Sequence, residues 1–191
     1  IYMLLLILSA LSIIPYIDIT VTTFVNSFKI QKYTEYFSDW IIYFNLFANI
    51  LILIKTKNYL VTFLRYFTEL IIINFFFKWL LDRPRPKYSL LKNNNSNKKN
   101  YISVFNLKIS KDWSKNQSFP SGHVSTIYLT YYLINNYNCK LLYFILLLLT
   151  IISRINLAAH HFSDCIVAMF ICNLCFIFYN NFINFNTFEI F

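Results

Sequence analysis

Long apolar stretches, separated by short polar ones, constrain the fold of this chain most. A helix that crosses the ~30 Å hydrocarbon core of a bilayer needs about 20 mostly apolar residues. Because six stretches approach this length, we expect an all-α polytopic membrane protein, a bundle of six transmembrane helices in one domain (residues 1–191). The stretches lie at residues 1–17, 39–54, 59–81, 120–136, 141–159 and 163–179. The first lacks the basic start and cleavage site of a signal peptide, so we interpret it as a helix.

Composition supports a membrane protein and excludes several other classes. Hydrophobic residues make up 58% of the chain and charged residues only 13%, whereas soluble domains are about 25% charged. The high hydrophobic fraction excludes a disordered chain, the single glycine excludes a collagen-like one, and four cysteines are too few for a disulfide-rich scaffold. The single glycine, Gly122, favours helices joined by few tight turns. Cys172 and Cys175 form a C-x-x-C pattern inside an apolar stretch, and we interpret them as buried structural thiols.

The net charge of +9 is concentrated in one part of the chain. Residues 83–115 contain nine basic residues and one acidic residue, and the basic loop 87–119 includes the run KNNNSNKKN. This loop is either a solvated segment beside a membrane or a surface for an anionic partner such as a lipid headgroup. We exclude nucleic acid, because no recognition motif is present. The connection 18–38 is moderately polar and is expected to lie at the membrane interface.

Several titratable residues fall at the ends of the predicted spans. Such residues are costly at membrane depth and indicate function. Because successive spans alternate in direction, the ends that carry these residues meet at one membrane surface. They are Lys78, Arg85, His123, Arg154, His160 and Asp164. Cations, histidines and a carboxylate together predict an oxyanion site with acid–base capacity. Arg65 and Glu69, by contrast, are expected to neutralise each other near the opposite membrane face.

The segment 119–123 adds an expected helix N-terminus to this site. Pro120 suits the first turn of a helix, and the free N–H groups that follow can bind an anion. Ser121 contributes a hydroxyl, and the amide of Gly122 can approach a phosphate oxygen closely because no side chain intervenes. An ordinary helix cap remains the alternative interpretation of this short motif.

Three motifs in order make the chain resemble integral-membrane members of the type 2 phosphatidic acid phosphatase superfamily. The family pattern reads K-x6-R-P, P-S-G-H and S-R-x5-H-x3-D. Here the motifs are Lys78-x6-Arg85-Pro86, Pro120-Ser121-Gly122-His123 and Ser153-Arg154-x5-His160-x3-Asp164. Family members often carry glycines near the third motif, where this chain has Ala158, Ala159 and Ala168.

The resemblance implies a role for each motif residue. It implies that His160 is the nucleophile that forms a phosphohistidine and that Asp164 hydrogen-bonds its other ring nitrogen. His123 would protonate the leaving oxygen and then activate water. The expected phosphate-binding residues are Lys78, Arg85, Ser121, Gly122 and Arg154. The resemblance implies no metal and no cofactor, and His161 and Arg83 fall outside the pattern.

The implied activity is that of a lipid phosphate phosphatase. The substrate would be phosphatidate, phosphatidylglycerophosphate, undecaprenyl pyrophosphate or a lipid A phosphate. There are two alternatives. One is a lipid phosphotransferase that uses the same phosphohistidine, and the other is a non-catalytic lipid-phosphate binder or transporter. The expected partners are the phosphorylated lipid and the bilayer, and the oligomeric state stays open.

The resemblance also implies a location, in a bacterial inner membrane with the active site facing the periplasm or exterior. This orientation conflicts with the positive-inside rule, which places basic residues on the cytoplasmic side. Only a few basic residues would then face the cytoplasm, namely Lys55, Lys57, Arg65 and Lys140.

Overall fold

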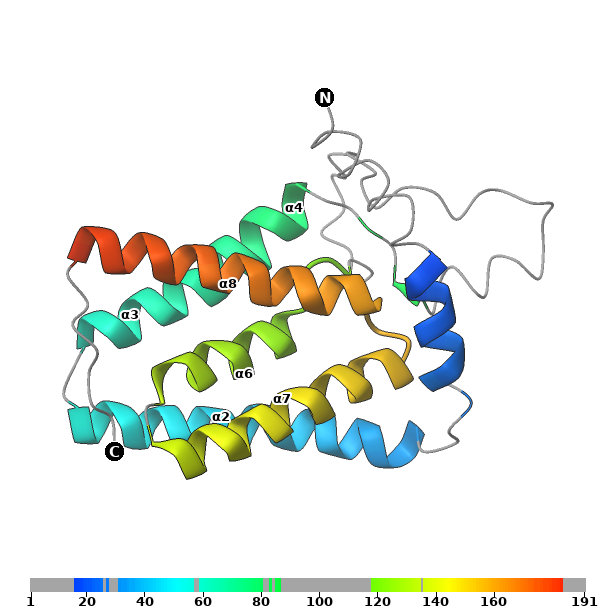
Figure 1. Cartoon of the computed structure of the whole chain (residues 1–191), viewed down its shortest axis with the longest axis horizontal. Coiled ribbons are helices and arrows are strands. Elements are labelled where there is room, and N and C mark those ends of the chain that lie inside the picture. The colour runs from blue at the N-terminus through cyan, green and yellow to red at the C-terminus, as the bar shows by residue number, and fades with distance from the viewer. Residues whose placement is uncertain are drawn as a thin grey trace.

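A computed structural model describes residues 16–25, 27, 31–56, 59–80, 83, 85–86, 118–134 and 136–183. All regular elements in these ranges are helical, and the long ones run side by side (Figure 1). They are a helix at Tyr16–Val25, α2 (Gln31–Thr56), α3 (Tyr59–Phe67), η1 (Thr68–Phe77), α4 (Lys78–Leu80), α6 (Gly122–Leu133), α7 (Tyr137–Asn156) and α8 (Phe162–Ile183). The expected all-α class is therefore confirmed for this part of the chain.

The expectation of six spans is only partly supported. Three helices are long and apolar enough to cross a membrane, at Tyr33–Ile54, Tyr137–Asn156 and Phe162–Tyr179. The predicted span 59–81 is helical over 59–80, but it contains the π-helical segment η1, and the predicted span 120–136 forms only the 12-residue α6. Residues 1–15 and 87–117 lie outside the described residues, and with them most of the first predicted span and of the basic loop.

The connection predicted for residues 18–38 is mostly helical, and its position at the membrane interface stays a prediction. Helix Tyr16–Val25 and the start of α2 occupy most of it. Its polar residues misled the prediction because several of them are buried in contacts between helices. Asp18, Thr34 and Ser38 are all buried, and such paired polar groups are compatible with a helix packed in the interior.

Helix α6 is the centre of the bundle and contacts α2, η1, α7 and α8. Its side chains Val124 and Ile127 are fully buried against Ile41 of α2 and Ile155 of α7. On the other side of α6, Leu129 packs with Ile73 of η1 and Cys172 of α8. Cys172 is a free, buried thiol, as the sequence predicts, whereas Cys175 is free but only partly buried. A short helix can therefore hold its position, because α2, η1, α7 and α8 all pack against it.

The outer surface of the bundle is apolar. On α7 the exposed side chains form a stripe along one face, namely Leu141, Leu142, Ile145, Leu148, Leu149 and Ile152. The buried face of the same helix includes Thr150, Ser153 and Arg154. An apolar outside and a partly polar inside are typical of an integral membrane protein, because lipid, unlike water, favours apolar contact.

Local signals fix where the helices begin. The side chain of Asn136 caps α7 by accepting hydrogen bonds from the amides of Asn138 and Cys139, at 3.0 and 3.2 Å. Helix α6 begins at Gly122 rather than at the predicted Pro120, with Ser121 as its N-cap residue. The start of α6, the end of α7 and the start of α8 lie at one end of the bundle, beside helix Tyr16–Val25 (blue in Figure 1). The motif residues therefore gather at that end.

Candidate active site

A cavity of about 390 Å³ opens at this end of the bundle. Its walls come from α2, η1, α4, α6 and the end of α7. The lining residues are Asp39, Ile42, Tyr43, Glu69, Asn74, Lys78, Arg85, Gly122, His123, Thr126, Arg154 and His160. Six of the eight predicted site residues therefore share one cavity. The other two, Ser121 and Asp164, are not among its described lining residues.

Three cationic side chains line the cavity, and contacts behind its wall position one of them. Arg154 donates from Nη1 to Oγ of Ser38 on α2 at 2.6 Å. The preceding motif residue, Ser153, donates to the backbone oxygen of Thr34 at 3.1 Å. These bonds hold α7 against α2 and fix the guanidinium beside Lys78 and Arg85. Three converging positive charges provide a site for a phosphate-sized anion.

His160 is buried at 2% exposure, and a hydrogen bond fixes its ring. Its Nδ1 lies 2.5 Å from the backbone oxygen of Ser118. A carbonyl oxygen can only accept, so Nδ1 carries the proton and Nε2 keeps a free lone pair. Burial, followed by the positive charge of Arg154, lowers the pKa of His160 well below its ordinary value. The imidazole is therefore neutral near pH 7.

The predicted hydrogen bond between Asp164 and His160 is wrong in this structure. The closest carboxylate oxygen of Asp164 lies 3.9 Å from Nδ1, because the carboxylate already has other partners. Oδ2 accepts from the backbone N–H of His161 at 2.8 Å, which caps the first turn of α8. Oδ1 accepts from Arg83 at 2.5 Å. Asp164 thus positions the start of α8. The backbone oxygen of Ser118 is the partner of Nδ1 of His160, the role that was expected for the carboxylate of Asp164.

Arg83, which lies outside the family motifs, joins three parts of the chain. Its guanidinium forms ion pairs with Asp18 at 2.7 Å and with Asp164 at 2.5 Å, and it donates to Ser163 at 2.6 Å. Its backbone oxygen accepts from the N–H of Ser118 at 2.8 Å. Arg83 therefore supports the carbonyl that orients His160. An acidic residue beside an apolar stretch was the sequence signal for Asp18.

Gly122 lines the cavity, whereas Ser121 is fully buried behind it. The backbone N–H of Ser121 donates to the carbonyl of Asp164 at 3.2 Å, and its own carbonyl accepts from Ser125 at 3.1 Å. Ser121 thereby connects the starts of α6 and α8. The predicted contact of its hydroxyl with phosphate has no support from this position.

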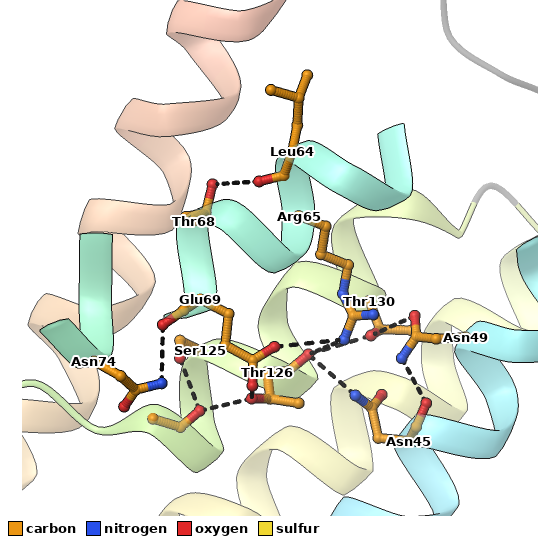
Figure 2. A network of polar contacts seen from close by, with 11 residues as sticks. Asn45, Asn49, Leu64, Arg65, Thr68, Glu69, Asn74, Ser125, Thr126 and Thr130 are labelled. Carbon is orange, nitrogen blue, oxygen red and sulfur yellow. Dashed lines mark hydrogen bonds and ion pairs between the residues drawn. The ribbon is translucent and has the colours of Figure 1, made fainter. Parts of the chain in front are cut away.

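Glu69 was predicted to lie near the opposite membrane face, but it lines the cavity. Figure 2 shows its carboxylate next to Thr126 of α6, which donates a hydrogen bond to it, and close to Arg65. Arg65 is 3% exposed and donates to the backbone oxygen of Thr126 at 3.3 Å. The prediction failed because the cavity extends deeper along α6 and η1 than the motif residues alone indicate.

The turn that carries His160 contains an unusual backbone conformation. Ala158 has a φ of 48°, in the left-handed region that glycine adopts without strain. Ala158 is one of the alanines at the third motif, so this chain places a residue with a side chain in that conformation. The turn is also closed by hydrogen bonds from the amides of Ala159 and His160 to the carbonyl of Arg154, at 3.1 and 3.3 Å.

Among the described residues, no group of three or more His, Cys, Asp or Glu side chains is arranged to hold a metal ion. The side chains in the cavity that suit an anionic group are the three cations, with the two histidines beside them.

Comparison with known proteins adds one finding. No curated protein and no solved structure matches the chain. The model of the PAP2 superfamily matches residues 58–188, a range that contains all three motifs and nine of the twelve residues that line the cavity. Membership of this superfamily implies phosphatase-type hydrolysis of a phosphoester. From the motifs, the cavity and this match, we conclude that the chain belongs to the PAP2 superfamily.

Proposed function

We propose that the chain hydrolyses a phosphomonoester or pyrophosphate on a membrane lipid, without a metal ion and through a phosphohistidine. The observation that carries this proposal is that His160 and His123 line the same cavity as Lys78, Arg85 and Arg154. A binding protein needs the cations, but it has no use for a neutral, oriented imidazole next to them.

In the first step, Nε2 of His160 attacks phosphorus and the bond from phosphorus to the alcohol oxygen breaks. The hydrogen bond from Nδ1 to Ser118 fixes the tautomer that this attack requires. Burial and the charges of the three cations lower the pKa of His123 to about 3 before substrate binds. The negative charge of the bound phosphate offsets these cations, so that His123 is protonated in the complex and supplies this proton to the departing oxygen, and the alcohol leaves neutral. The three cations stabilise the charge on the phosphoryl oxygens, which is the main requirement of phosphoryl transfer.

In the second step, water replaces the alcohol. His123, now the base, takes a proton from water as its oxygen attacks phosphorus, and the bond to His160 breaks. Inorganic phosphate leaves and both imidazoles return to their starting state. Gly122, the first residue of α6, lines the same cavity, and we propose that its backbone N–H supports the anion there.

The surroundings of the cavity favour a lipid substrate over a soluble one. The bundle has an apolar outer face, and three of its helices are long enough to cross a membrane. The cavity lies at the helix ends, where a lipid headgroup would lie while its chains stay in the bilayer. We therefore propose an amphiphile that enters from the membrane.

Phosphate release by the purified protein in detergent tests this function. With a chelator present, we expect release from a lipid monophosphate, no release by His160→Ala, and a loss of about 10²- to 10⁴-fold in His123→Ala. The matched control is His161→Ala, which removes a neighbouring imidazole and should keep near-wild-type activity. Activity that depends on added metal, or that survives in His160→Ala, would refute the proposal.

A further inference from the structure

The cavity continues past the catalytic groups into a second polar region. Glu69 and Asn74 of η1 and Thr126 of α6 line it together with the motif residues; we name these three residues the acceptor pocket. The total volume of about 390 Å³ lies within the range of ~300–1,000 Å³ that small-molecule sites occupy. The cavity can therefore hold part of the alcohol as well as the phosphate.

Glu69 has an unused acceptor in this pocket. One carboxylate oxygen accepts a hydrogen bond from Thr126. The other, Oε2, is buried and has no hydrogen-bond partner among the described residues, although the side chain as a whole is 16% exposed. Buried carboxylate oxygens are normally satisfied by donors. Oε2 itself has almost no accessible surface, so a hydroxyl in the cavity reaches it after a rotation of the partly exposed carboxylate.

The neighbour of Glu69 indicates what kind of donor fits. Nη2 of Arg65 lies 4.0 Å from Oε2, too far for a hydrogen bond but close enough to balance the negative charge. A ligand ammonium would add a second cation beside a buried guanidinium, which is unfavourable. A neutral hydroxyl can donate to Oε2 without changing the charge of the pocket.

The acceptor pocket also lies next to the position that the alcohol half of the substrate must occupy. His123, the proposed proton donor to the leaving oxygen, and Thr126 are three residues apart on α6 and share a face of that helix. Because Thr126 is bonded to Glu69 (Figure 2), an alcohol that leaves next to His123 lies beside the acceptor pocket. Asn74 is held there by its 2.8 Å hydrogen bond to the backbone oxygen of Glu69.

We propose that Glu69 determines specificity by accepting a hydrogen bond from a free hydroxyl on the alcohol half of the ester. This inference rests on the proposed phosphatase function and deepens it. The preferred substrate class is a phosphomonoester of a polyol lipid, whose glycerol or sugar unit carries an unesterified hydroxyl near the phosphate. Esters of simple long-chain alcohols lack this group and leave Oε2 unpaired.

Two substrates that differ in one hydroxyl provide the test. One is a monoacyl glycerol phosphate with a free hydroxyl, and the other is its deoxy analogue, a monoacyl propanediol phosphate of equal chain length. For the wild-type protein we expect kcat/KM to favour the hydroxyl-bearing substrate by about tenfold or more, because a site built around a hydroxyl rejects the analogue that lacks it.

The variant for this test removes the buried pair as a unit. Arg65→Met combined with Glu69→Leu leaves neither charge unpaired in the interior, so the fold is expected to survive. In this double variant the ratio of the two kcat/KM values should fall to near one. Asp39→Asn is the matched control, since it neutralises the other carboxylate of the cavity wall and should keep the preference.

Two results would overturn the inference and leave the phosphatase function intact. The first is equal kcat/KM for both substrates in the wild-type protein, as expected if only water occupies the pocket. The second is a preference that persists in the double variant. Phosphate release from neither substrate would overturn the proposed function and this inference together.

Discussion

Gly122 is the only glycine in the chain, and its surroundings explain why a side chain is unfavourable there. A β-carbon built on Gly122 would lie 2.7 Å from Oδ1 of Asn74, closer than such atoms approach in folded proteins. The side chain of Asn74 would have to shift, which disturbs its hydrogen bond to the backbone oxygen of Glu69. The glycine therefore serves the cavity wall in addition to any contact of its amide with phosphate.

A double-mutant cycle separates these two roles of Gly122. Gly122→Ala should reduce kcat/KM by about tenfold, the equivalent of one neutral hydrogen bond. In an Asn74→Ala background the same change should cost much less, because the clashing amide is gone. An equal loss in both backgrounds, measured by phosphate release, would show that the added methyl group disturbs the phosphate itself.

The motifs predicted correctly that most of the candidate site residues share one cavity, but they did not predict the contacts that support them. Lys78, Arg85, His123, Arg154 and His160 line the cavity as expected. The partner of His160 was missed, because Ser118 contributes a backbone oxygen, and any residue type can do that. Side-chain motifs carry no information about such contacts.

The kind of helix that carries Glu69 and Asn74 explains why the sequence pattern did not place them in the cavity wall. Residues 68–77 form a π-helix, whereas the periodicity used to assign helix faces assumes 3.6 residues per turn. Beyond Phe67 a regular helical periodicity would not show which side chains, such as Asn74, lie on the cavity side. The extent of helices α7 and α8 was predicted more closely, because their apolar stretches are long and end at clear polar residues.

The packing of helix Tyr16–Val25 against α8 depends on a buried ion pair. Asp18 is 2% exposed and accepts from Arg83, from the amide of Ser163 at 2.8 Å and from the hydroxyl of Ser163 at 2.6 Å. Because removal of one partner leaves a buried charge without compensation, Asp18→Ala should lower the free energy of unfolding by about 3 kcal/mol. Thermal or denaturant unfolding in detergent measures this loss.

Glu35→Gln is the control for this prediction, since it neutralises an exposed carboxylate on α2. It should change stability little. If Asp18→Ala were no less stable than Glu35→Gln, the ion pair with Arg83 would not hold helix Tyr16–Val25 against α8.

The cavity with the candidate site residues opens at one end of the bundle. The orientation of the molecule in the membrane therefore decides which side of the membrane the site faces. We propose that the end with the cavity faces the periplasm or exterior. Cys139 is exposed at the start of α7, and the cavity lies at the other end of that helix. The two ends can therefore be labelled separately.

Cysteine labelling in intact cells tests this orientation. A membrane-impermeant thiol reagent should label Asn95→Cys, a position in the basic loop, and should leave Cys139 unlabelled until the membrane is opened. A Cys139→Ser background isolates the signal from position 95. Labelling of Cys139 but not of position 95 would place the cavity on the cytoplasmic side, as the positive-inside rule predicts.

Trapping of the phosphoenzyme tests the central claim most directly. Wild-type protein would be mixed with a lipid monophosphate labelled in the phosphate and quenched rapidly in alkali, which preserves phosphohistidine. The account predicts transient label on a peptide containing His160, more persistent label in His123→Ala once the intermediate forms, and none in His160→Ala. Phosphate release without label on the wild-type protein, or unchanged label in His160→Ala, would contradict it.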